Sequence, residues 1–210
     1  MWSDVVCPWC YLGLGRFRAA LDRFEHRDEV ELVFRPYQLD PTAPPEPSSI
    51  LDAYARKFGG PGNAVRIVAD MTATAAAEGL EFNLEQALRV NTFDAHRLGV
   101  LAAGHGLDVD VHERLFAAYF TEARDLSDRE VLAELAAEVG IQREEARGWL
   151  AGDGGVSEVR EGLGTAAALG ITAVPSFVID RSAMVPGAQD PDTFLLVLER
   201  LHEKGREADG

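Results

Sequence analysis

Residues with strand-forming side chains are concentrated at the two ends of the chain, and this distribution limits the folds that the chain can adopt. Near the N-terminus, residues 2–6 and 30–37 predict two strands, the second because VELVFRPY is rich in β-branched and aromatic side chains. Near the C-terminus, residues 171–180 and 182–188 predict a hairpin. The long stretch between these pairs has helical periodicity instead. Any sheet must therefore be assembled from both ends of the chain.

Helices are expected to fill most of the remaining sequence. Apolar residues recur at helical spacing from Trp9 to about Phe24, and the proline-rich residues 38–49 end the second strand. Ser127 and Glu130 have the spacing of a capping box, which predicts where one later helix starts. The predicted helices beyond the first cover residues 49–58, 63–78, 92–103, 109–124, 127–139, 142–151 and 156–169, with a last helix that Asp190 caps.

The order of these elements indicates the α/β class. If residues 41–154 are set aside, the order is β-α-β-α-β-β-α, which is typical of a thioredoxin-like fold. We therefore expect a thioredoxin-like domain made of residues 1–40 and 155–210, with residues 41–154 inserted in it as an all-helical domain. With 210 residues and 47% hydrophobic residues, the chain can bury a core without disulfide bonds.

The composition argues against several kinds of partner. The chain has 35 acidic and 20 basic residues and a formal net charge of −15, which repels the phosphates of nucleic acids. No apolar run is long enough to span a membrane, and the N-terminus lacks the basic and apolar regions of a signal peptide. We therefore expect a soluble cytoplasmic protein that binds neither nucleic acid nor membranes.

The two cysteines of the chain, Cys7 and Cys10, form a C-x-x-C motif between the first predicted strand and the first predicted helix. A structural zinc site needs more ligands than two cysteines supply, and the five histidines show no pair at zinc-motif spacing, so no metal is expected. A structural disulfide is disfavoured because so short a loop gains little stability and because the cytoplasm is reducing. A redox-active dithiol is the hypothesis that the motif favours.

The position of each cysteine suggests its role. Cys7 lies at a helix N-terminus, where unpaired N–H groups and the helix dipole favour a thiolate, so it is the expected nucleophile. Cys10 lies one turn further along and is the expected resolving thiol. Between them, Pro8 stiffens the turn and Trp9 offers an apolar surface. Pro175, which opens a later strand after Val174, is compatible with a cis peptide bond, although sequence statistics alone favour trans.

Four stretches resemble the DsbA-like branch of the thioredoxin superfamily, and within it the cytoplasmic FrnE-type oxidoreductases. They are WSDVVCPWCYLG at 2–13, NTFDAHRL at 91–98, GITAVPSFVID at 170–180 and VPGAQ at 185–189. The resemblance implies a thioredoxin fold with a helical insertion and thiol–disulfide exchange at the two cysteines. It also implies a cis Pro175 packed against the dithiol, and a backbone at Val174 that pairs with an extended substrate peptide.

One position in the motif bears on the redox potential. In the strongly oxidising periplasmic relatives, the position that matches Trp9 is a histidine, whose positive charge helps to stabilise the reduced thiolate. Tryptophan cannot supply that charge. The resemblance therefore implies a weaker oxidant, suited to work as a reductase, an isomerase or a stress-linked thiol exchanger.

The stretch at 91–98 supplies candidate substrate contacts. Asn91 and His96, together with Arg97, could face the dithiol and bind a substrate carboxylate or the sulfur. The alternative is that Asn91 caps a helix and that His96 packs between the two domains. Helix capping is the commoner use of an asparagine at such a position, so the alternative is favoured.

The leading functional hypothesis is a disulfide oxidoreductase that acts on proteins or small thiols, without a bound cofactor and with glutathione as a possible co-substrate. The alternative enzyme is a glutathione-dependent isomerase, of the type of hydroxychromene carboxylate isomerases and kappa-class glutathione transferases, which share this architecture. A third hypothesis is a binding module without catalysis. Two intact cysteines argue against the binding module and favour the first enzyme over the second.

Overall fold

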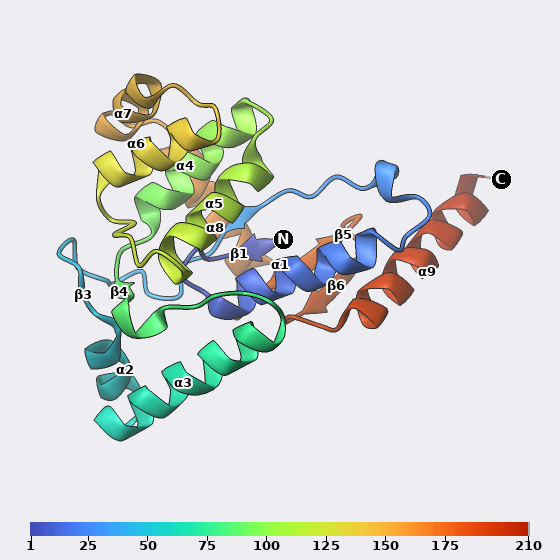
Figure 1. Cartoon of the computed structure of the whole chain (residues 1–210). Helices are drawn as coiled ribbons and strands as arrows, with labels where there is room; N and C mark the ends of the chain where they lie inside the picture. Colours follow the sequence, from blue (N-terminus) through green and yellow to red (C-terminus); the bar gives the residue numbers. More distant parts are fainter. Residues whose placement is uncertain (210) are drawn as a thin grey trace.

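The computed structural model describes the backbone of residues 1–209 and the side chains of residues 1–206. Its centre is a four-stranded mixed sheet in the order β2-β1-β5-β6 (Figure 1). The strands are β1 (Trp2–Ser3), β2 (Arg35–Pro36), β5 (Ser176–Ile179) and β6 (Ala183–Pro186). β1 is parallel to β2 and antiparallel to β5, so the N-terminal strand is placed between a strand near it in sequence and one from the other end of the chain.

The second strand is shorter than the sequence predicts. Residues 30–37 were expected to form it, whereas the ladder includes only Arg35 and Pro36, which pair with Trp2 and Ser3. Residues 30–34 lie outside the ladder because the neighbouring strand β1 spans only two residues. The predicted C-terminal hairpin is present, with Phe177 opposite Val185 and Val178 opposite Met184.

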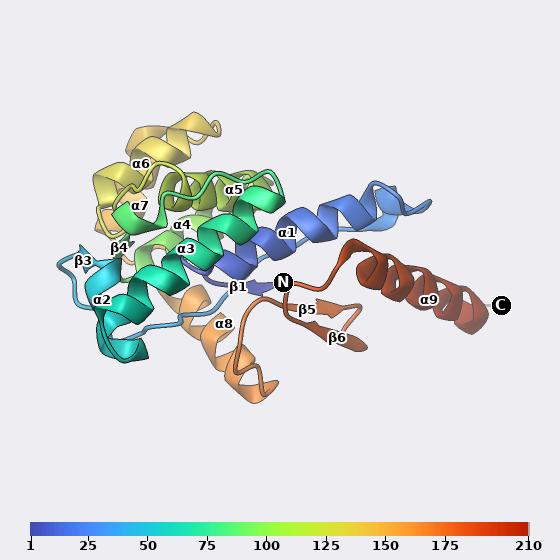
Figure 2. The same ribbon diagram turned by 60° about the horizontal axis from the view of Figure 1, so that its bottom comes forward.

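Helices cover both faces of the sheet. On one face, Phe17 of α1 (Pro8–Leu21) stacks on Phe177 of β5 and meets Phe194 of α9 (Pro191–Asp209) edge to face, with ring centroids 5.2 and 5.4 Å apart. On the other face, α8 (Val156–Ala168) contributes Ala166 to a small cluster with Trp2. Figure 2 shows α1 and α9 together on one side of the sheet and α8 on the other.

The region between β2 and α8 is mainly helical, as predicted. Its helices are α2 (Ile50–Phe58), α3 (Pro61–Ala77), α4 (Phe93–Gly104), α5 (Asp108–Phe120), α6 (Arg129–Glu138) and α7 (Arg143–Ala151). It also contains a ladder that the sequence did not predict, in which β3 (Ser48–Ser49) pairs with β4 (Leu88–Arg89). We propose that residues 41–154 form an insertion domain. Among the described residues, no helix is both long and apolar enough to cross a membrane.

The start of α6 corrects one detail of the sequence prediction. Ser127 was expected to cap this helix in a capping box with Glu130, but the cap is Asp128, whose carboxylate accepts a hydrogen bond from the Glu130 amide at 2.8 Å. The Ser127 hydroxyl instead donates to Asp125. Asp128 takes the cap position because it lies one residue closer to the first helical turn than Ser127, and because a carboxylate is a stronger acceptor than a hydroxyl.

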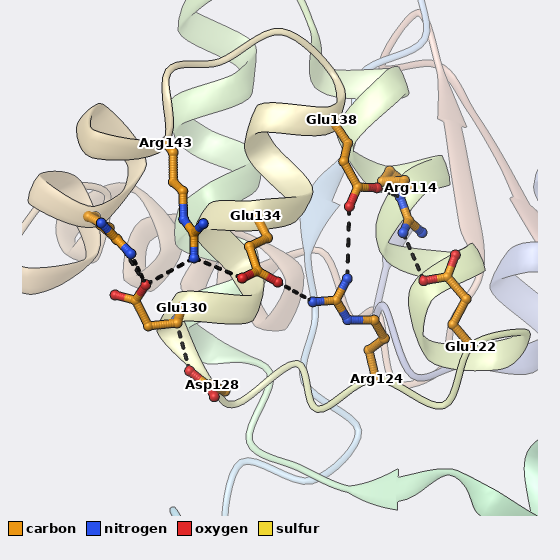
Figure 3. A network of polar contacts seen from close by, with 9 residues as sticks. Arg114, Glu122, Arg124, Asp128, Glu130, Glu134, Glu138 and Arg143 are labelled. Carbon is orange, nitrogen blue, oxygen red and sulfur yellow. Dashed lines mark hydrogen bonds and ion pairs between the residues drawn. The ribbon is translucent and has the colours of Figure 1, made fainter.

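Ion pairs join the outer helices of this region. Figure 3 shows Arg124 bound to both Glu134 and Glu138, with Arg143 bound to Glu134 and Arg114 bound to Glu138. These side chains come from α5, α6, α7 and the segment that precedes α6. Because the groups are partly exposed, each pair adds little stability, and the network chiefly fixes how the helices pack.

An aromatic stack connects the helical region to the helix that carries the cysteines. Tyr11, which follows Cys10 on α1, stacks on Phe116 of α5 and on Phe82, with ring centroids 5.1 and 5.8 Å apart. The helical region therefore packs directly beside the start of α1, where the dithiol lies.

Candidate active site

The dithiol lies where the sequence predicts it, at the transition from β1 to α1. Cys7 is the N-cap of α1, Pro8 is its first residue, and the Cys10 amide donates a hydrogen bond to the Cys7 carbonyl at 2.9 Å. Both cysteines are free thiols, with Cys7 3% exposed and Cys10 fully buried. Trp9 is 43% exposed, so it extends the surface beside the sulfurs.

The loop before β5 lies against Cys7. The Val174–Pro175 peptide bond is cis, as the resemblance implies. The Cys7 thiol lies 3.6 Å from the Val174 carbonyl oxygen, to which it can donate. Pro175 packs on α1 at Gly13, where an added Cβ would lie only 3.1 Å from the Pro175 Cγ. The absence of a side chain at Gly13 therefore lets the Pro175 loop approach the dithiol helix, a role that no pattern in the sequence indicates.

Cys10 is strongly biased toward the protonated form. Burial raises the pKa of Cys10 well above that of a free thiol, and the neighbouring Cys7 sulfur raises it further. The nearby Ser3 hydroxyl and Asp4 backbone act in the opposite direction on this pKa. Cys10 must therefore lose a proton before it can attack. Neither Ser3 nor Asp4 was singled out from the sequence.

Asp4 anchors the turn that carries Cys7. Its carbonyl accepts a hydrogen bond from the Cys7 amide at 3.0 Å, and its buried carboxylate accepts one from the Leu39 amide at 2.7 Å. His96 Nε2 lies 2.9 Å from the Tyr37 carbonyl and 3.5 Å from the Asp4 carboxylate. Since a carbonyl only accepts, Nε2 carries a proton. His96 thus faces Asp4 at the junction of the helical region and the sheet, which agrees with the packing alternative.

Asn91 is also occupied by structural contacts. Its side-chain oxygen accepts a hydrogen bond from the Phe93 amide at the start of α4, and its side-chain nitrogen donates to the Ala43 carbonyl, each at 3.0 Å. These contacts fit the helix-capping alternative. Substrate contacts by Asn91 and His96 stay predictions.

Arg97 does not face the dithiol. Its buried guanidinium donates to the backbone at the end of α7 and pairs with Asp94 of its own helix. The acceptors and distances are Gly152 at 2.6 Å, Gly154 at 2.7 Å, Trp149 at 2.8 Å and Leu150 at 3.2 Å. All of these carbonyls lack helical partners or lie in the last turn, so Arg97 serves as a side-chain cap for α7.

A cavity of about 390 Å³ opens beside Val6, the residue that precedes Cys7. Burial raises the pKa of Tyr54 in the cavity wall, and negative charge on Cys7 raises it further. Arg56 and Lys57 also line the cavity. The cavity thus offers apolar side chains and positive charge beside the residue before Cys7, in a chain whose net charge is −15.

The sequence comparison decides the family. A model described as the DSBA-like thioredoxin domain matches residues 1–199 of the chain. The chain belongs to this family. The DsbA-like resemblance and the thioredoxin-like fold that the sequence predicts are both confirmed.

Three proteins illustrate what this DSBA-like chain is similar to. A probable DsbA oxidoreductase from Streptomyces coelicolor shares 38% identity, with a TM-score of 0.89 over 95% of this chain and 87% of that chain. The uncharacterized protein YwbO of Bacillus subtilis is 27% identical over 207 residues, 92% of each chain. The cytosolic disulfide reductase DsbM from Pseudomonas aeruginosa, solved with GSH, shares 20% identity and a TM-score of 0.63 over 96% of this chain and 97% of that chain. This last likeness shows the fold alone.

Proposed function

We propose that the protein is a thiol–disulfide oxidoreductase in which Cys7 is the nucleophile and Cys10 the resolving thiol. The observation that carries the proposal is the arrangement of the two sulfurs. Cys7 occupies the N-cap position of α1, keeps 3% exposure and lies 3.6 Å from the Val174 carbonyl, whereas Cys10 is fully buried. This difference supports Cys7 as the sulfur that meets the substrate.

The reaction follows from these positions. The Cys7 thiolate attacks one sulfur of a substrate disulfide, the substrate S–S bond breaks, and the other substrate sulfur leaves as a thiolate. Cys10 then loses its proton and attacks the Cys7 sulfur, which releases the second substrate thiolate and leaves a Cys7–Cys10 disulfide. The substrate gains two electrons and the dithiol loses two. The raised pKa of Cys10 makes its deprotonation the costly step, and the departing substrate thiolate is the natural proton acceptor.

The cavity beside Val6 supports a small or extended substrate that carries negative charge. Arg56 and Lys57 would attract carboxylates, and the Val174 backbone would pair with an extended peptide next to the disulfide. Disulfides of proteins and mixed disulfides of glutathione both fit this description. With tryptophan at position 9 in place of histidine, we propose net reduction or isomerisation in the cytoplasm.

Cys10→Ser tests this assignment. The variant should lose multiple-turnover reduction of insulin in the presence of a thiol donor, and covalent adducts on Cys7 should accumulate because no thiol remains to resolve them. Cys7→Ser is the matched control, since it should lose turnover without forming adducts. Mass spectrometry of the trapped adducts identifies the substrates.

A glutathione-dependent isomerase would give a different result. Its nucleophile is the sulfur of bound glutathione, which needs only one polar group for activation, so Cys10→Ser would be nearly silent. Full activity of that variant, together with isomerisation of an aromatic keto acid that requires glutathione, would replace the oxidoreductase proposal with this alternative.

A further inference from the structure

Three side chains with metal-ligating atoms lie close together beyond the C-terminal end of α1, far from the dithiol at its N-terminal end. They are His26 in the segment that follows α1, Glu29 in the short 3₁₀ helix η1 (Arg27–Glu29), and His202 on α9. His26 and His202 are distant in sequence, which is why the spacing of the histidines indicated no metal site. The fold brings the two residues together because α9 packs along α1.

The separations of the ligand atoms suit a tetrahedral metal ion. The Nδ1 atom of His26 lies 3.3 Å from Glu29 Oε1, and the Nδ1 atom of His202 lies 3.6 Å from Glu29 Oε2. Zinc bound at about 2.0–2.2 Å holds tetrahedral nitrogen and oxygen ligands roughly 3.3–3.6 Å apart. Each Nδ1 atom therefore lies at such a separation from one of the two Glu29 carboxylate oxygens, and one ligand atom from each of the three residues lies within 4.8 Å of the others.

The histidine rings are held in place by aromatic packing but retain room to turn. The rings of His26 and His202 stack with centroids 3.8 Å apart and planes at 17°, and Phe24 packs its ring edgewise against both. The two histidine side chains are 33% and 20% exposed. Ring lone pairs point along the ring plane, so binding one ion requires the stacked rings to tilt toward each other, which this exposure permits.

The environment of His202 selects the atom that can bind. Its Nε2 atom is buried and has no hydrogen-bond partner among the described residues, so an ion from solvent cannot reach it. Its Nδ1 atom faces the Glu29 carboxylate, which is largely exposed. The side of the cluster that solvent can reach is therefore the side on which His202 Nδ1 faces the Glu29 carboxylate.

We propose that His26, Glu29 and His202 bind a divalent transition-metal ion of the zinc class, with water as the remaining ligand. Two imidazoles and one carboxylate form a donor set that suits zinc. The bound ion would connect η1, through Glu29, to α9, through His202. Since α1 rises about 1.5 Å per residue over its 14 residues, the ion lies roughly 20 Å from the sulfurs and stabilises the fold without entering the thiol chemistry.

The test must exclude the cysteines, because thiolates bind zinc themselves. Titration calorimetry with zinc chloride on the full chain carrying Cys7→Ser and Cys10→Ser should show one ion per chain. Adding Glu29→Gln or His202→Gln should weaken binding by at least about 100-fold, since loss of even an outer-shell partner costs roughly 10–100-fold. Zinc at about 100 times its Kd should raise the Tm by roughly 5–10 °C.

His105→Gln is the matched control. His105 also faces a carboxylate, with Nε2 2.8 Å from Glu145 Oε1, but it belongs to a pair and not to a cluster of three. This variant should bind zinc as the parent does. If His202→Gln fails to fold, as judged by circular dichroism, Glu29→Gln carries the test because its side chain is 65% exposed. Absence of zinc binding, or binding that survives Glu29→Gln in folded protein, overturns the proposal.

Discussion

Gly13 controls how closely the Pro175 loop approaches the helix of the dithiol. An added Cβ at this position would lie 3.1 Å from the Pro175 Cγ and 3.3 Å from the Ala188 Cβ, both closer than ordinary packing. Gly15, two residues further along the same helix, has no neighbouring atom within 4 Å of such a Cβ. The two glycines therefore separate the effect of packing from that of helix propensity.

Gly13→Ala should lower both stability and activity. Overpacking should cost about 1–3 kcal/mol, whereas alanine regains only about 0.5–1 kcal/mol in helix propensity. Displacement of Pro175 should also slow insulin reduction. Urea denaturation and turnover measure the two effects, and Gly15→Ala should be neutral or slightly stabilising with full turnover. Equal stability and equal turnover of the two variants would show that the contact between Gly13 and Pro175 affects neither property.

The raised pKa of Cys10 predicts a strict order of thiol reactivity. In the folded protein, iodoacetamide at neutral pH should modify Cys7 and spare Cys10, because Cys10 is fully buried and stays protonated. Peptide mapping by mass spectrometry reads the order. Modification of Cys10 before Cys7 would reverse the assigned roles.

Ser3→Ala extends this test to the reaction. The Ser3 hydroxyl lowers the pKa of Cys10, so its removal should raise that pKa further and slow the attack on the mixed disulfide. The mixed disulfide on Cys7 should then persist longer in a rapid-quench experiment, and the delay should shrink as the pH rises. A lifetime unaffected by the substitution would mean that Ser3 does not act on Cys10.

Sequence patterns located the close pair of cysteines but not the residues that surround it. A C-x-x-C motif at a strand-to-helix junction is a local signal, so Cys7 and Cys10 could be found without the fold. Ser3, Asp4 and Gly13 act through contacts with distant segments or buried atoms, and nothing in their local sequence distinguishes them from ordinary turn and helix residues.

At the scale of elements, Arg97 is the residue that holds the end of α7 against α4. The segment after α7 turns through Gly152 and Gly155, and its carbonyls point inward at the guanidinium rather than at water. The backbone takes this path because Gly155 adopts a φ of 73°, which a glycine accepts without strain.

Arg97→Met should destabilise the protein by about 3–5 kcal/mol, because it leaves the buried carbonyls after α7 without donors and removes the buried partner of the Asp94 carboxylate. Arg129→Met is the control. Arg129 donates to the same carboxylate at 2.6 Å but is half exposed, so its loss should cost less than about 1 kcal/mol. Chemical denaturation monitored by circular dichroism compares them. Similar losses in both variants would refute the capping role of Arg97.

Most helices could be predicted from apolar periodicity, whereas the short strands could not. The boundaries of α4 and α8 differ from the prediction by no more than one residue, since each begins and ends at turn residues that the sequence displays. The predicted length of strand β2 was too great, and strands β3 and β4 were not predicted. A two-residue ladder depends on the neighbouring strand with which it pairs, and it is too short to leave a periodic pattern in the sequence.

For the whole molecule, the predicted order of elements was enough to recover the thioredoxin-like core, but not the contacts that join it to the helical region. The stacking of Tyr11 on Phe116 and the approach of His96 to Asp4 both link residues far apart in sequence. Such pairs arise from the packing of complete elements. The same is true of His26 and His202, which only the path of α9 brings together.

The position of β1 in the sheet has a consequence for biosynthesis. Trp2 pairs with Ser176 of β5, so the central strand gains its second neighbour only after the whole segment between these two residues has left the ribosome. Contacts of such high sequence separation form late. Cys7 and Cys10 are made well before Val174, whose carbonyl meets the Cys7 thiol. During translation the nascent chain thus exposes two thiols that are open to oxidants and to other chains.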